Sequence, residues 1–174
     1  MAAFSLKTLF SHPVLVPAGL LLLAVTALGS ALTSQYVFGL IPCPLCLYQR
    51  WPYAIIIVLS IVALFMGLKK NPKAVSRLVF LCGLALLAGG LIAAYHTGVE
   101  QHWWKSFLEG CSVNFGGAVD LLKQIESTVA ARCDEIPWSL FGISMAGYNA
   151  IFSLIAAPLT MLASVMIARK ANGL

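Results

Sequence analysis

The sequence predicts an all-α membrane protein, a bundle of four transmembrane helices that forms a single domain over residues 1–174. The composition supports this fold class, because 60% of the residues are hydrophobic and only 10% are charged. In a soluble domain about a quarter of the residues are charged. The hydrophobic residues are also concentrated in four runs that contain no charged residue, at residues 14–32, 51–68, 78–94 and 140–168. Each run approaches or exceeds the roughly 20 residues that a helix needs to cross a bilayer.

The four runs give predicted spans at about residues 14–33, 48–68, 76–95 and 145–167. The first could instead be a cleavable signal peptide, because Lys7 precedes it and small residues follow. It is longer than the usual signal core of roughly 7 to 15 residues, and its removal would leave an odd number of spans, so we expect it to be retained. The third run is rich in glycine and alanine, which permit close helix contact in lipid.

The charged residues predict the orientation. Seven basic residues lie before the first span, between the second and third, and after the fourth, with no acidic residue among them: Lys7, Lys69, Lys70, Lys73, Arg77, Arg169 and Lys170. All six acidic residues lie between the third and fourth spans. Basic residues in short loops stay in the cytoplasm, so both termini are predicted to be cytoplasmic and the loops at about 34–47 and 96–142 to be exported. The charge of +5 is therefore a topology signal, and no nucleic-acid partner is expected.

The long second exported loop contains one stretch with helical periodicity. Apolar residues recur through residues 118–131 with a helical period, which predicts a short helix. This helix would lie either in the membrane interface or on the other four helices. The four tryptophans are all on the exported side, where indole rings prefer the headgroup layer: Trp51, Trp103, Trp104 and Trp138. We therefore expect this loop to follow the membrane surface.

Four of the five cysteines lie in the exported segments, and only Cys82 lies inside a span. The exported four are Cys43, Cys46, Cys111 and Cys133. Disulfides form and persist in exported compartments, so this even set indicates redox chemistry or a disulfide framework. Cys82 is expected to be a small packing residue.

Cys43 and Cys46 form a C-x-x-C motif at the start of the second span. A disulfide across so short a loop gains little chain entropy and exchanges readily, which is typical of a redox-active pair. The helix that begins after the motif directs free N–H groups at the sulfurs, and we expect it to lower the pKa of a thiolate there. Arg50 adds a cation at the edge of the hydrocarbon, either as a functional residue or as an arginine that reaches the interface.

Cys111 and Cys133 lie 22 positions apart in the second exported loop. A disulfide between them would stabilise the folded loop by roughly 3 kcal/mol through loss of chain entropy, so a purely structural bridge is one interpretation. The other depends on the combination of the two pairs. A tight pair at the membrane face and a second pair on a long tether could pass electrons from an exported protein to an acceptor in the lipid.

The order of motifs along the chain resembles that of the bacterial disulfide bond formation protein B (DsbB) family. The residues that carry the resemblance are PCPLCLYQR at 42–50, YHTGVE at 95–100, Cys111, Cys133 and GISMAGYN at 142–149. The resemblance implies an inner-membrane, quinone-dependent thiol:disulfide oxidoreductase. Such a protein reoxidises a DsbA-like periplasmic thiol oxidase and passes the electrons to the membrane quinone pool, which sustains disulfide formation in exported proteins.

The resemblance also implies a role for each cysteine pair. Cys43 and Cys46 would hand electrons to the cofactor, ubiquinone or else menaquinone, while Cys111 and Cys133 would exchange with the DsbA-like partner. The exported loops would then be periplasmic.

Two further residues match the quinone site of the family. Arg50 matches its arginine, and a cation there would stabilise negative charge on a quinone oxygen during reduction. His96, at the outer end of the third span, resembles a second quinone-site residue that could donate a hydrogen bond or a proton. His102 is the alternative for this second role.

Two other functions fit parts of the same pattern. A vitamin K epoxide reductase-like protein is also a four-helix quinone and thiol enzyme, and the feature that separates them is that the C-x-x-C here precedes the second of four spans. A non-enzymatic protein could use the four exported cysteines as an all-cysteine zinc site or as inert staples. Zinc sites usually have two closely spaced pairs, so no metal site is predicted.

Overall fold

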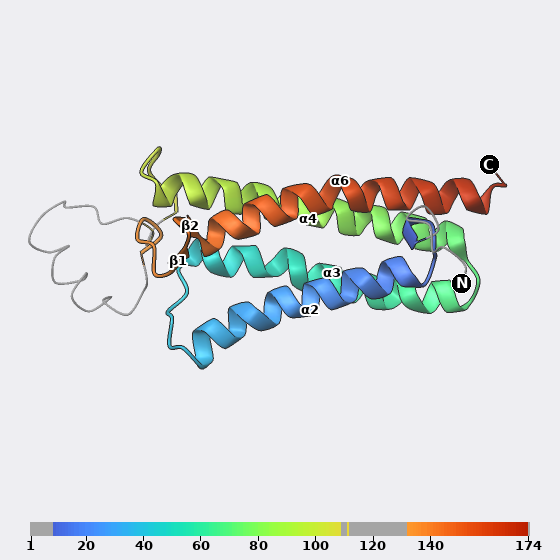
Figure 1. Cartoon of the computed structure of the whole chain (residues 1–174), viewed down its shortest axis with the longest axis horizontal. Coiled ribbons are helices and arrows are strands. Elements are labelled where there is room, and N and C mark those ends of the chain that lie inside the picture. The colour runs from blue at the N-terminus through green and yellow to red at the C-terminus, as the bar shows by residue number, and fades with distance from the viewer. Residues whose placement is uncertain (1–8, 109–110, 112–131, 174) are drawn as a thin grey trace, which may run out of the picture.

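The computed structural model describes residues 9–108, 111 and 132–173. Its four long helices are α2 (Leu15–Tyr36), α3 (Pro44–Leu68), α4 (Pro72–Glu100) and α6 (Met145–Ala171). All four are long and apolar enough to cross a membrane, and they lie lengthwise in one bundle (Figure 1). The predicted class, a four-helix membrane protein, is confirmed. The predicted helix at 118–131 lies outside the described residues.

Three of the four helices, α3, α4 and α6, begin after a residue whose side chain caps the helix. Cys43 caps α3 and is followed by Pro44, and Asn71 caps α4 and is followed by Pro72. Proline suits the first position of a helix because its missing N–H would have no partner there. The Ser144 hydroxyl caps α6 by accepting a hydrogen bond from Gly147 N–H at 3.0 Å. As a result, α3 and α4 begin before their predicted spans.

α4 also ends later than its predicted span, at Glu100 rather than near residue 95. The extension adds more than one helical turn at the end of the bundle that carries the C-x-x-C motif. It places His96 and Glu100 four residues apart, and therefore on the same face of the helix.

Small residues bring α4 close to its neighbours. A Cβ atom at Gly83 would lie 2.7 Å from the Met161 side chain of α6, and one at Gly90 would lie 3.0 Å from Leu154. These contacts explain the glycine-rich composition of the third span, because in lipid close backbone approach is a main source of helix association. Cys82 is completely buried in the apolar core beside these contacts, as a packing residue would be.

A two-stranded hairpin, not predicted for an all-α chain, leads into α6. Strands β1 (Ser139–Leu140) and β2 (Ile143–Ser144) pair antiparallel through a turn at Phe141 and Gly142, both with positive φ. A tight turn of this kind needs positive φ at both central residues, and only Gly142 adopts it without strain. The hairpin lies at the same end of the bundle as the start of α3 (Figure 1).

The chain folds back on α4 directly after the helix ends. Trp103 N–H donates to the Gly98 carbonyl at 2.9 Å, and the Trp104 indole N–H donates to the Tyr95 carbonyl at 3.1 Å. Tyr95 packs against the rings of both Trp104 and Phe107. A Cβ atom at Gly98 would lie 2.0 Å from the Trp104 ring, so glycine is required at this close approach.

Candidate functional site

The C-x-x-C motif forms the start of α3, with Cys43 as the capping residue and Cys46 in the first turn. Both are free thiols in this structure. Cys43 donates its S–H to the Cys46 sulfur across 2.9 Å, and the Cys46 backbone N–H donates to the Cys43 sulfur at 3.2 Å. Because Cys46 is already helical, Arg50 lies one turn further along the same face of α3.

The pKa of Cys43 differs from the expectation for a cysteine at a helix N-terminus. Its hydrogen bond with the Cys46 thiol, together with burial, raises the pKa of the Cys43 thiol above its usual range. The Cys46 backbone N–H acts in the opposite direction and is outweighed. Cys43 is therefore the member of the pair that retains its proton and serves as the donor.

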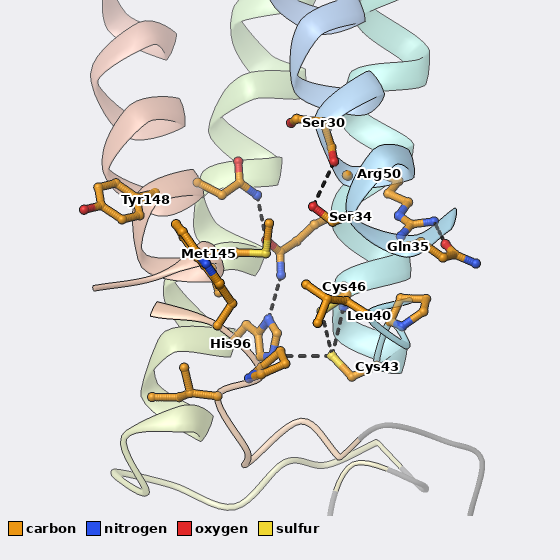
Figure 2. Close-up of a pocket in the computed structure, with 18 of the residues that line it drawn as sticks. Ser30, Ser34, Gln35, Leu40, Cys43, Cys46, Arg50, His96, Met145 and Tyr148 are labelled. Carbon is orange, nitrogen blue, oxygen red and sulfur yellow. Dashed lines mark hydrogen bonds between the residues drawn. The ribbon is translucent and has the colours of Figure 1, made fainter. Parts of the chain in front are cut away.

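His96 faces this pair from α4, with only 2% of its surface exposed (Figure 2). Its Nε2 lies 3.5 Å from the Cys43 sulfur, and its Nδ1 lies 2.8 Å from the side-chain nitrogen of Gln49. One turn further along α4, a Glu100 carboxylate oxygen lies 3.8 Å from Nε2. The Glu100 carboxylate also accepts a hydrogen bond from the Ser144 hydroxyl. His96 therefore lies between the thiols and a buried carboxylate.

His102, the alternative to His96, lies in the turn after α4 and is exposed. It contributes nothing to the walls of the cavity described below, whereas His96 does. Of the two histidines, the structure brings only His96 to the C-x-x-C pair.

A cavity of about 490 Å³ opens beside the cysteine pair and is bounded by α2, α3, α4 and α6. Apolar side chains predominate in its walls, among them Leu28 of α2 and Phe152 of α6. Arg50 reaches into the wall, where its Nη1 donates to the Gln35 side-chain oxygen at 2.7 Å (Figure 2). The Arg50 Nε is buried and has no hydrogen-bond partner within the described part of the chain. A buried N–H without a partner is rare, and Arg50 is one of the residues that line the cavity.

Cys111 and Cys133 form a disulfide, and both residues are fully buried. They pack in one apolar cluster with Cys43, Leu45 and Val99. The four exported cysteines therefore meet at one end of the bundle, although the two pairs are more than 60 residues apart in sequence. In this state the second pair is docked on the first and is not presented to solvent.

Residues 132–138, around the second cysteine of this disulfide, contribute to the walls of the cavity. Arg132 donates two hydrogen bonds to Asp134, at 3.0 and 2.8 Å, and lies 3.1 Å from a Glu135 oxygen. The Arg132 guanidinium holds the pKa of Asp134 below its usual range, so this exposed pair is charged at neutral pH. Ile136 and Trp138 then line the cavity together with Arg132 and Glu135.

The close contact between Gly98 and Trp104 gives a prediction about the stability of the docked Cys111–Cys133 disulfide. We expect Gly98→Ala to displace the Trp104 ring and to destabilise the docked position of the disulfide by about 1 kcal/mol. The population of molecules in which the disulfide is undocked should then rise about fivefold. The measurement is the rate at which a small-molecule thiol reduces the Cys111–Cys133 bond in the purified protein. Gly19→Ala is the matched control, because a Cβ atom at Gly19 meets nothing within 4 Å. Equal reduction rates in the two variants would contradict the prediction.

Comparison with known proteins decides the family. The family model described as "Disulfide bond formation protein DsbB" matches residues 14–163. The chain belongs to the DsbB family. It is therefore a multi-pass membrane protein of disulfide bond formation, as the resemblance in its motifs implied.

Several members of the DsbB family align along most of their length. A disulfide bond formation protein B from Aromatoleum aromaticum is 31% identical, and the alignment covers 98% of both chains. One from Chromohalobacter salexigens is 33% identical over 86% of this chain and 90% of its own. An uncharacterized protein from Rickettsia prowazekii, RP370, is 27% identical over 78% of each chain. No solved structure matches.

In this DsbB-family protein the six predicted site residues all lie at one end of the bundle. Three polar residues beside them were not predicted: Gln49, Glu100 and Asn149. Glu100 could have been found from its spacing, because it follows His96 by four positions and so shares its face if the helix continues. The other two carry no local signal, since their relation to His96 arises only when α3, α4 and α6 pack together.

Proposed function

We propose that this DsbB-family protein reoxidises a DsbA-like periplasmic thiol oxidase and passes the electrons to membrane quinone. The observation that carries the proposal is the packing of the two cysteine pairs in one buried cluster, next to a largely apolar cavity with an unpartnered arginine N–H. A purified protein supplied with a reduced dithiol and ubiquinone provides the test. The match to DsbB over residues 14–163 favours this reaction over that of a vitamin K epoxide reductase-like protein.

The proposed location is the bacterial inner membrane, with the cysteine pairs on the periplasmic side. Basic residues of the α3–α4 turn and of the end of α6 lie at the opposite end of the bundle (Figure 1). They are Lys69, Lys70, Lys73, Arg169 and Lys170. Basic residues favour the cytoplasmic side, so this distribution supports a periplasmic site.

The residues around the cavity fit a quinone. Its apolar walls suit the ring and an isoprenoid chain, and a few polar groups would fix the ring orientation. Arg50 would hold a ring oxygen through its free Nε–H and would stabilise negative charge there. When bound, ubiquinone or menaquinone would supply an acceptor for two electrons and two protons. Glu100, which is buried beside His96, is placed to take up a proton released by the thiols.

The proposed reaction proceeds by two thiol-disulfide exchanges. A thiolate of the reduced partner attacks the Cys111–Cys133 disulfide, and its second thiol resolves the mixed disulfide, so that the partner leaves oxidised. A thiolate of the reduced loop pair then attacks the Cys43–Cys46 disulfide, and closure of the loop bond leaves Cys43 and Cys46 as thiols. Each exchange moves two electrons.

The final step returns Cys43 and Cys46 to the disulfide and releases two electrons, while the two protons leave separately, one when Cys46 ionises and one from Cys43 as the bond closes. The structure holds the combination of bonds that precedes this step, a reduced C-x-x-C and a closed loop disulfide. Cys46 is the more exposed of the two residues, and its sulfur accepts the S–H of Cys43. We assign it as the thiolate that faces the quinone, with Cys43 as the residue that closes the bond.

The role of Arg50 gives a prediction about quinone affinity. Arg50→Gln removes a half-buried cation and its unpartnered N–H, so the KM for ubiquinone should rise by about 10- to 100-fold, the range for a hydrogen bond from a charged group. The measurement is a titration of ubiquinone at saturating dithiol. Arg77→Gln serves as the control, because Arg77 lies near the start of α4 and does not line the cavity. This variant should keep the KM of the unmodified protein. A KM that stays unchanged in Arg50→Gln would contradict the assignment.

One observation favours a second candidate, a metal site. Cys43, Cys46 and His96 bring three donor atoms within 4.8 Å of one another, a set that suits a soft divalent metal. The all-cysteine zinc site considered from the sequence does not form in this structure, because Cys111 and Cys133 are bonded to each other. Elemental analysis of the purified protein separates the two functions, since one zinc per chain would contradict the quinone proposal.

A further inference from the structure

Side-chain hydrogen bonds connect His96 to the interior of the bundle through three helices. Gln49 of α3 contacts His96 Nδ1 at 2.8 Å, and the Asn149 amide nitrogen of α6 donates to the Gln49 oxygen at 2.6 Å. The Asn149 oxygen in turn accepts from the hydroxyls of Tyr53 and Ser153. Gln49, His96 and Ser153 are at most 7% exposed, so water does not compete for these bonds.

The direction of these bonds is fixed by a backbone carbonyl. An amide side chain can be flipped, which exchanges the positions of its nitrogen and oxygen. Its orientation must therefore be assigned from a neighbouring group that can only donate or only accept a hydrogen bond. The Leu45 carbonyl is such a group, because it only accepts, and the Gln49 side-chain atom facing it at 3.3 Å must be the nitrogen. The same nitrogen faces His96 Nδ1. The Asn149 end agrees, since the oxygen of Gln49 faces an amide nitrogen.

It follows that His96 Nδ1 is an acceptor and carries no proton. A neutral imidazole carries one proton, which must then be on Nε2. Nε2 lies 3.5 Å from the Cys43 sulfur and 3.8 Å from a Glu100 oxygen. His96 therefore presents an N–H to the cysteine, and Nε2 has no free lone pair with which to take the Cys43 proton.

We infer that Gln49, supported by Asn149, is a positioning residue that holds His96 in the Nε2–H tautomer, so that His96 is a fixed hydrogen-bond donor to Cys43 and not its base. The inference rests on the proposed function for its effect on turnover. In that reaction Cys43 loses its proton when the C-x-x-C disulfide closes. The His96 N–H and the Cys46 N–H both face its sulfur and stabilise the charge that develops there. Glu100, a buried carboxylate 3.8 Å from His96 Nε2, is then left to accept the proton.

The test is the ¹⁵N NMR spectrum of the reduced, quinone-free protein with labelled histidine, in which His96→Asn assigns the His96 signals. The expected spectrum has a pyridine-type nitrogen at Nδ1 and a pyrrole-type nitrogen at Nε2. Gln49→Glu places a group that only accepts beside Nδ1, so Nδ1 should become protonated. Turnover with dithiol and ubiquinone should fall by about 10- to 100-fold, as for loss of a hydrogen bond to a charged group.

Gln101→Glu is the matched control, because it makes the same chemical change at an exposed position just after α4 and should leave the His96 signals unchanged. A proton on Nδ1 in the unmodified protein would overturn the inference, even if Gln49→Glu failed to fold. An unchanged tautomer in Gln49→Glu would overturn it as well. The spectrum is recorded without quinone or partner, so failure of the proposed function would appear separately, as an absence of quinone reduction by a protein whose His96 has the expected tautomer.

Discussion

Serine in place of Cys46 should abolish quinone reduction, with a loss of at least about a thousandfold, as expected when a nucleophile is removed. A serine hydroxyl cannot form the Cys43–Cys46 disulfide, and at neutral pH it is not ionised. The electrons delivered to the C-x-x-C pair would then have no path to the cavity beside Arg50. The measurement is dithiol-driven loss of ubiquinone absorbance by the purified variant in detergent.

Cys82→Ala is the control for this experiment, because Cys82 is a free cysteine in the core and outside the proposed relay. Its turnover should match that of the unmodified protein. Undiminished turnover in Cys46→Ser would exclude the C-x-x-C pair as the electron donor to quinone.

Replacing Cys133 with alanine should convert the exchange with the partner into a stable covalent complex. The Cys111 thiolate left by the substitution would attack the disulfide of the oxidised partner, which forms a mixed disulfide and frees the partner's second thiol, and the loop would lack the Cys133 thiol that normally displaces the partner. Cys43→Ala and Cys46→Ala are added in the same chain, because both pairs lie in one end of the bundle and an internal bond to Cys111 could otherwise form. Most of the protein should then run as a mixed disulfide on a non-reducing gel.

Mass spectrometry of the trapped species identifies the partner, which should be a periplasmic protein joined through a cysteine of its own C-x-x-C motif. Adding Cys111→Ala to this variant is the control and should remove the complex. A chain that forms no adduct in cells with an active periplasmic thiol oxidase would contradict the proposed exchange at Cys111.

The four helices could be predicted because the membrane imposes its requirements on composition. A span must be long, apolar and free of charge, and each of these properties can be seen along the chain without knowledge of its neighbours. The ends of the helices were predicted less accurately than their existence. Cys43 and Asn71 cap helices that begin before the apolar runs, so the hydrophobic pattern placed the starts of α3 and α4 too late.

The candidate site divides in the same way. The cysteines could be identified from the sequence, because four cysteines in exported segments indicate disulfide or redox chemistry. The partners of His96 do not stand out, because Gln49 and Asn149 are 100 positions apart and meet only when α3 packs near α6. The buried state of the second pair was also not foreseen. The second pair, expected on a long tether, instead lies in one buried cluster with Cys43 and Leu45.

In the proposed reaction, two cysteine pairs carry electrons from a protein dithiol to a membrane quinone. The most direct test is the stoichiometry of an anaerobic reaction that contains the purified protein, a reduced DsbA-like dithiol and ubiquinone. One quinone should be reduced for each dithiol oxidised, over many turnovers of the protein. Dithiol oxidation without quinone reduction, or no reaction in a correctly folded protein, would contradict it.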